Sequence, residues 1–129
     1  MTHSTAVDGF TEKADALAEG GVDVLWMETM SFNEEVAVAI EAAKTTDLPI
    51  CASMTFDTAS RSMMGLVPAD FAQFVRELGA NFVGTNCGIG PAELLHLVHG
   101  ILTASGSLPV VAKGNCGIPG YIGGSIHFH

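Results

Sequence analysis

Cys87 is the residue whose type and surroundings most clearly suggest chemistry. It follows an apolar segment and precedes Gly-Ile-Gly-Pro, which opens a predicted helix. The dipole of a helix favours a thiolate near its N-terminus, and a thiolate there can bind zinc or attack an electrophile. A free cysteine is also often buried as a small apolar side chain. The residues alone therefore leave Cys87 open between a metal ligand, a nucleophile and a core position.

The other cysteines and two terminal histidines have different surroundings. Cys51 lies within the apolar segment 48–55, which predicts a buried core position. Cys116 lies in a glycine-rich segment, and its role stays open. His127 and His129 form a His-x-His pair at the end of the sequence, and their role also stays open.

Three polar residues close to apolar segments are candidates for binding. Glu28 follows an apolar run, and a carboxylate there can bind an ammonium group or a metal, act as a base, or cap the next helix. Asn86 and Asn115 each follow a predicted strand, where an asparagine side chain can fix a loop through hydrogen bonds to the backbone. Residues 86–91 could also hold an anion at a helix N-terminus.

These residues are embedded in an alternation of helices and strands. We expect helices over residues 8–19, 33–44, 68–79 and 92–103, and strands over 22–27, 48–55, 81–85 and 108–112. The strands start near residues 23, 49, 81 and 108, and these intervals of 26 to 32 residues are close to the length of a βαβ unit. The strands are continuous apolar runs, as in a parallel sheet. The fold class is α/β. Residues 114–129 contain five glycines and no predicted helix, so we expect a loop there.

Each predicted strand ends in polar residues. These are Glu28 and Thr29, residues 55–57, residues 85–88 and residues 113–116. In parallel α/β folds, ligands bind at the carboxyl ends of the strands. We therefore expect the four groups to lie on one rim and to face a shared pocket.

The length, composition and charge of the chain exclude several kinds of partner and location. The chain has 129 residues, a length that favours a single domain, and a net charge of -9. The acidic surplus argues against nucleic acid and against an anionic membrane surface as partners. No apolar run is long enough to span a bilayer, and the first ten residues contain no signal peptide. Three cysteines without a secretory signal predict reduced thiols and a cytoplasmic location.

Four segments, taken together, resemble a known enzyme family. They are residues 22–30 (VDVLWMETM), 54–65 (MTFDTASRSMMG), 84–91 (GTNCGIGP) and 113–119 (KGNCGIP). In this order and spacing they are similar to the homocysteine S-methyltransferase family, which includes the homocysteine-binding barrel of methionine synthase and betaine–homocysteine methyltransferase. The resemblance covers nearly the whole chain, and Gly-x-Asn-Cys-x-x-Gly-Pro is its most specific element.

The resemblance implies a (β/α)₈ barrel, of which residues 1–129 would form strands four to seven. It also implies a zinc ion held by three cysteines. Cys87 matches the first of these, whereas the adjacent pair of the family's last strand has no counterpart in the chain. Glu28 matches an acid that contacts the homocysteine amino group. Asn86 and Asn115 match residues of the substrate-binding rim, and Cys116 replaces an alanine of the family motif.

The resemblance therefore predicts part of a zinc-dependent enzyme that transfers a methyl group to homocysteine and yields methionine. The partners would be homocysteine and a small methyl donor: betaine, S-methylmethionine, S-adenosylmethionine or a folate. We expect the chain alone to be inactive, and to aggregate or form homo-oligomers, because half a barrel leaves strand edges open. The alternatives are a small α/β enzyme with Cys87 as nucleophile and a non-catalytic anion-binding α/β module.

Overall fold

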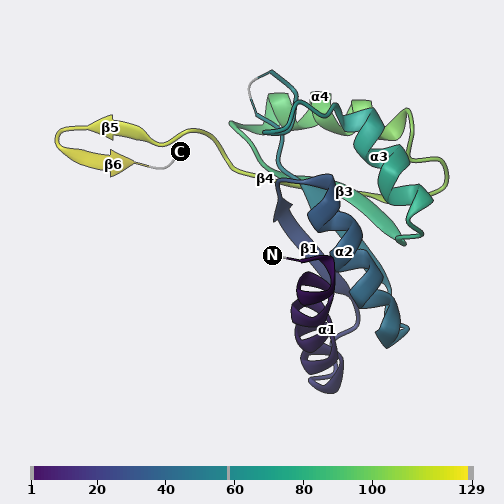
Figure 1. Ribbon diagram of the computed structural model, residues 1–129. Helices are drawn as coiled ribbons and strands as arrows, with labels where there is room; N and C mark the ends of the chain where they lie inside the picture. The colour runs from purple at the N-terminus through teal and green to yellow at the C-terminus, as the bar shows by residue number, and fades with distance from the viewer. Residues whose placement is uncertain (1, 58, 128–129) are drawn as a thin grey trace.

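A single sheet of four parallel strands forms the centre of the molecule. The computed structural model describes residues 2–57 and 59–127. The strands lie in the order β1 (Leu25–Met30), β2 (Ile50–Met54), β3 (Phe82–Cys87) and β4 (Val110–Gly114). Every neighbouring pair is parallel (Figure 1). The predicted α/β class and the sequential strand order are therefore confirmed.

One helix precedes the sheet, and one connects each pair of consecutive strands. These are α1 (His3–Glu19), α2 (Asn33–Ala43, followed by the 3₁₀ turn η1, Lys44–Thr46), α3 (Pro68–Glu77) and α4 (Pro91–Leu102). Helix α1 begins earlier than expected because the Thr2 side chain accepts a hydrogen bond from the Thr5 backbone N–H at 3.2 Å and caps it. None of the helices in the described ranges has the length and apolarity needed to cross a bilayer.

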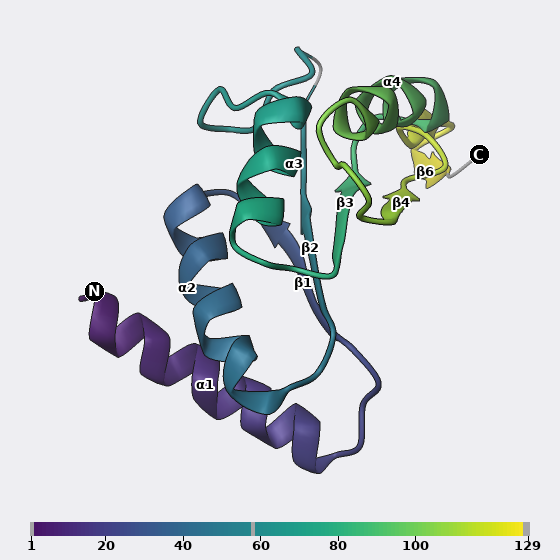
Figure 2. The ribbon, with the colours of Figure 1, turned by 90° about the vertical axis from the view of Figure 1, so that its right-hand side faces the viewer.

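The helices pack on one face of the sheet. Strand and helix side chains enter one buried core, whose members include Leu25, Met27, Ala52, Met54 and Val83 from the strands and Val36, Ile40, Phe71, Val75 and Ile101 from the helices. Each helix contacts the next, from α1 to α4, so the helices form a single layer (Figure 2). The expected arrangement, with helices on one outer face of a partial barrel, is confirmed.

The opposite face of the sheet carries the intervening strand residues. Successive residues of a strand alternate between the two faces, which places on it Trp26 of β1, Ser53 of β2, Asn86 of β3 and Lys113 of β4. The register between β1 and β2 shifts between Met27 and Met30, and the ion pair with Lys113 places Glu28 on the same face. No helix within residues 2–57 and 59–127 packs on this inner face, and 42% of the Trp26 surface is exposed. The inner face is therefore uncovered at Trp26 and mixed in polarity, since Cys51, Phe82 and Val111 also lie on it, whereas the outer face is apolar and covered.

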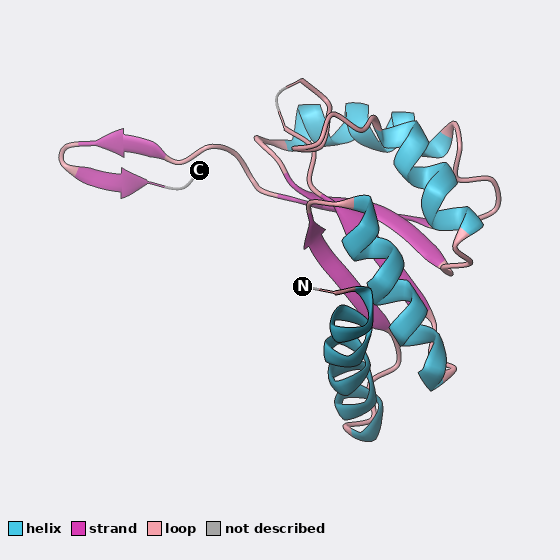
Figure 3. Cartoon of the chain, viewed as in Figure 1, coloured by secondary structure: helices cyan, strands magenta, loops and turns pink. Residues whose placement is uncertain are grey.

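The C-terminal segment forms a hairpin that the sequence analysis did not predict. Strands β5 (Gly120–Ile122) and β6 (Ser125–His127) pair antiparallel, and the hairpin projects from the sheet (Figures 1 and 3). Gly123 and Gly124, with φ of 58° and 85°, form the two-residue turn. Two glycines with positive φ suit the turn twist that hairpins require.

Candidate functional site

The carboxyl ends of the strands bring the predicted site residues to one edge of the sheet. Asn86 of β3 lies opposite Lys113 of β4, and Cys87 lies opposite Gly114. Asn115 follows directly, and its backbone N–H donates to the Cys87 carbonyl at 3.1 Å. Strands β1, β3 and β4 continue past their predicted ends, so Asn86 and Cys87 belong to β3 itself, whereas β2 ends one residue before its predicted end.

Asn86 connects three strands at this edge. Its side chain is 1% exposed, and its Oδ1 accepts hydrogen bonds from the Thr29 backbone N–H at 3.2 Å and from the Ser53 hydroxyl at 2.9 Å. Its Nδ2 lies 2.8 Å from Thr29 Oγ1 and 3.1 Å from Thr55 Oγ1. The residue therefore fixes the ends of β1 and β2 relative to β3.

The same amide contacts the thiol of Cys87. Asn86 Nδ2 lies 3.1 Å from Cys87 Sγ, and Cys87 is half-buried. Cys87 and Thr29 both have φ of 61°, a left-handed conformation that is rare for residues other than glycine and most unusual for a β-branched one. Such strain persists only where the surroundings enforce it, and it is concentrated at functional sites. Asn86 touches both strained residues.

Asn115 holds the segment that follows Cys87. Besides the bond from its backbone, its Nδ2 donates to the Gly88 carbonyl at 3.0 Å. The loop after β4 therefore supports the turn after β3, as expected for an asparagine that fixes a loop.

Glu28 forms an ion pair that the sequence analysis missed. The Lys113 ammonium lies 2.8 Å from Glu28 Oε1 and 2.9 Å from Oε2. It also lies 5.9 Å from the centre of the Trp26 ring, close enough for a cation–π contact. The Trp26 indole N–H donates to Ser53 Oγ at 3.3 Å. A lysine placed directly after an apolar strand, on the rim shared with Glu28, was the available signal.

The three cysteines are free and differ in exposure: Cys51 is buried, Cys87 intermediate and Cys116 exposed. Burial, with a smaller contribution from the nearby Glu28 carboxylate, raises the pKa of Cys51 to about 11. Cys51 is thus a protonated core thiol at neutral pH, as predicted.

As a zinc site, the described part of the chain is incomplete. Cys87 is a partly exposed thiol on the rim, which suits a metal ligand. Residues 2–57 and 59–127 contain no cluster of three or more His, Cys, Asp or Glu side chains arranged to hold a metal ion. His127 lies in β6, and His129 lies outside the described residues.

The raised pKa of Cys51 predicts a loss of stability at alkaline pH. Because folding raises this pKa, the contribution is complete below the unfolded-state value near 9 and is lost as pH rises through about 11. A shift of two units corresponds to about 2–3 kcal/mol. In denaturant titrations from pH 8 to 11.5, the free energy of unfolding of wild type should therefore fall by this amount relative to that of Cys51→Ala. Parallel curves would contradict the assignment.

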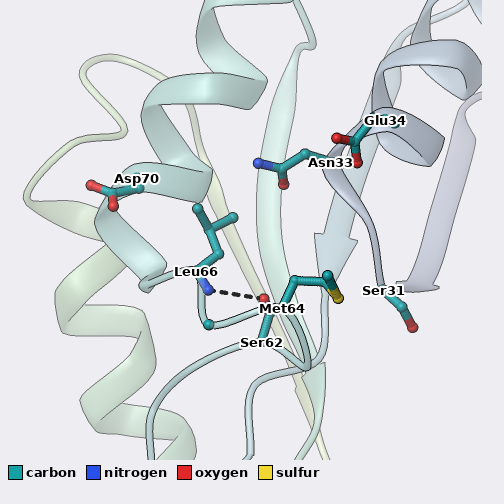
Figure 4. A pocket seen from close by; sticks show the side chains of 8 residues that line it. Ser31, Asn33, Glu34, Ser62, Met64, Leu66 and Asp70 are labelled. Atoms are coloured by element: carbon teal, nitrogen blue, oxygen red, sulfur yellow. Dashed lines mark hydrogen bonds between the residues drawn. The ribbon is translucent and has the colours of Figure 1, made fainter.

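A separate cavity of about 290 Å³ lies between the starts of α2 and α3 (Figure 4). It is lined by Ser31, Asn33, Glu34, Ser62, Met64, Gly65, Leu66 and Asp70. The Leu66 N–H donates to Ser62 Oγ at 3.2 Å within it, and the buried Asn33 Oδ1 has no hydrogen-bond partner among the described residues. Neither Glu28 nor Cys87 lines this cavity, so it is distinct from the predicted site.

The fold and rim define a partial TIM-barrel-like unit with its polar residues at the carboxyl ends of the strands. A type I 3-dehydroquinate dehydratase from Clostridium difficile has a similar structure, with a TM-score of 0.57 over 89% of this chain and 45% of the dehydratase. The two sequences are 13% identical, so this similarity concerns the fold.

The sequence identifies the family. Residues 1–128 match the model of the homocysteine S-methyltransferases, and the chain belongs to this family. It is 29% identical to methionine synthase of Mycobacterium tuberculosis over 119 residues, which are 87% of the chain and 10% of the relative. It is 30% identical to betaine–homocysteine S-methyltransferase 1 of Rattus norvegicus over 89 residues, 69% of the chain and 22% of the relative. The chain thus spans from a tenth to less than a quarter of these two relatives.

Proposed function

We propose that the chain forms strands four to seven of the barrel of a zinc-dependent homocysteine S-methyltransferase. The observation that carries this proposal is the rim thiol of Cys87, a residue with a strained backbone whose sulfur is contacted by Asn86. Cys87 pairs with Gly114, the residue after Lys113 of the Glu28–Lys113 ion pair. Family membership and relatives named for methyl transfer to homocysteine support the reaction class.

In this proposal, Cys87 is one zinc ligand, and the other ligands lie outside the described residues. A zinc ion in such a site would supply a charge that keeps a bound substrate thiol deprotonated at neutral pH. Glu28 binds the substrate ammonium. Asn86 and Asn115 contribute to substrate binding by holding Cys87 and the loop beside it in place.

Two further parts of the proposal concern the state of the protein. Within the described residues, β1 and β4 are the edges of the sheet, and exposed edges favour association. This supports homo-oligomers or aggregates of the isolated chain. The three free cysteines support a cytoplasmic location.

Methyl transfer tests the proposal directly. The full-length protein should convert L-homocysteine to methionine with one of four donors: betaine, S-methylmethionine, S-adenosylmethionine or methylfolate. Chelation should abolish the activity and added zinc should restore it, whereas residues 1–129 alone should be inactive and bind little zinc. Activity that survives complete removal of zinc would contradict the proposal. Methylation of the Cys87 thiol by a methyl donor in the absence of homocysteine would favour the alternative in which Cys87 is a nucleophile.

A further inference from the structure

The Glu28–Lys113 ion pair lies on the open inner face of the sheet, at the end where Cys87 lies. The carboxylate is 34% exposed and the lysine side chain 62% exposed, so both are accessible to a ligand. Both carboxylate oxygens already lie within 2.9 Å of the Lys113 ammonium. A ligand cation that approaches Glu28 therefore meets a positive charge already in place.

We propose that Glu28 and Lys113 together bind the two charges of an α-amino acid, with Glu28 taking the α-ammonium and Lys113 the α-carboxylate of homocysteine. This inference rests on the proposed function and adds a residue that determines specificity. A simple amine would place two cations on one carboxylate, an arrangement that like-charge repulsion disfavours. An α-amino acid brings its own carboxylate one carbon from its ammonium, so each charge of the pair gains a partner.

Lys113 is free to change partner at little cost. Exposed ion pairs contribute about 0–1 kcal/mol, so breaking the bond to Glu28 is a small loss. The contact of its ammonium with the Trp26 ring, 5.9 Å from the ring centre, keeps the charge above the inner face during such a movement.

The pair is placed to direct the substrate sulfur toward Cys87. Lys113 lies opposite Asn86 in the ladder, and the next residue, Gly114, lies opposite Cys87. Glu28 precedes Thr29, which Asn86 links to the Cys87 sulfur. In homocysteine two methylene groups separate the α-carbon from the sulfur. A molecule held by its two charges at the pair can therefore extend along the rim to Cys87.

Binding of two thiols by the full-length protein tests the inference. The ligands are L-homocysteine and 3-aminopropane-1-thiol, which is homocysteine without its carboxylate, and calorimetry gives their affinities. Lys113→Met should weaken homocysteine binding roughly 10- to 100-fold, the range for a lost charged hydrogen bond. Binding of the aminothiol should change less than about threefold or improve, because the competing cation is gone. Lys113→Arg, which keeps the charge, should retain most of the preference for homocysteine.

Lys13→Met is the matched control. Lys13 is also an exposed lysine above an aromatic ring, 5.8 Å from the centre of Phe10, but it lies on α1. Its loss should leave both affinities unchanged. If Lys113→Met weakens both thiols equally or neither, the inference is wrong while the proposed function stands. If wild type binds neither thiol, both the inference and the proposed function are wrong.

Discussion

Replacement of Asn86 by alanine should lower the free energy of unfolding of the full-length protein by about 3–5 kcal/mol, since it removes several side-chain hydrogen bonds that contribute about 0.5–1.5 kcal/mol each. The substitution removes the acceptor for the Thr29 N–H and the partner of the Cys87 sulfur. It also removes the nearer of two acceptors of the Ser53 hydroxyl, the other being the Met27 carbonyl at 3.2 Å. The contacts of Asn86 with Thr29 and Cys87, both of which have the left-handed conformation, are lost as well. The loss is a large part of the stability of a typical domain.

Asn81→Ala is the matched control for this prediction. Asn81 is an exposed asparagine whose Oδ1 accepts one hydrogen bond, from the Ile50 N–H at 2.8 Å, at the other end of the sheet. Its loss should cost about 1 kcal/mol, the usual contribution of one hydrogen bond. Urea titrations in the presence of a chelator separate this effect from any loss of zinc. An Asn86→Ala penalty no larger than that of Asn81→Ala would refute the role of Asn86.

The sheet and its helices were predictable because local patterns specify them. Apolar runs marked the strands, and prolines at positions 68 and 91 marked two helix starts. The ends of the strands were less predictable. Backbone pairing continues through Asn86 and Cys87 against Lys113 and Gly114, whatever the polarity of the side chains. The hairpin turns at Gly123 and Gly124, a dipeptide typical of both tight turns and loops, so the glycine-rich composition of residues 114–129 alone predicts a loop.

The contacts within the site depend on register and could not be derived from local sequence. Glu28 and Lys113 lie 85 positions apart, on the two edge strands, and their side chains meet only in the folded sheet. The partners of Asn86 come from β1 and β2 and from the residue after β2. Threonine disfavours the left-handed conformation of Thr29, which lies where the register of β1 shifts between Met27 and Met30 and where its N–H donates to Asn86.

Replacement of Cys87 by alanine should remove both zinc and methyl transfer from the full-length protein. A three-thiolate site that loses one ligand must replace a strong Zn–S bond by water or a weaker donor. Loss of an outer-shell partner alone costs about 10–100-fold in metal affinity, so loss of a ligand should cost more than about 100-fold. Activity should fall to the background rate, because homocysteine would no longer be held as a thiolate.

Cys51→Ala is the control that separates this effect from a general loss of thiols. Cys51 is 2% exposed, and its raised pKa keeps it protonated at neutral pH, so it is unsuited to bind zinc. We expect this variant to keep its zinc and its activity.

The zinc content of the purified full-length protein tests the central claim most directly. After dialysis against metal-free buffer, elemental analysis should find about one zinc per molecule in wild type and in Cys51→Ala, as for a tightly held site. In Cys87→Ala the ratio should be close to zero. A full complement of zinc in Cys87→Ala would show that Cys87 is not a ligand and would contradict the account.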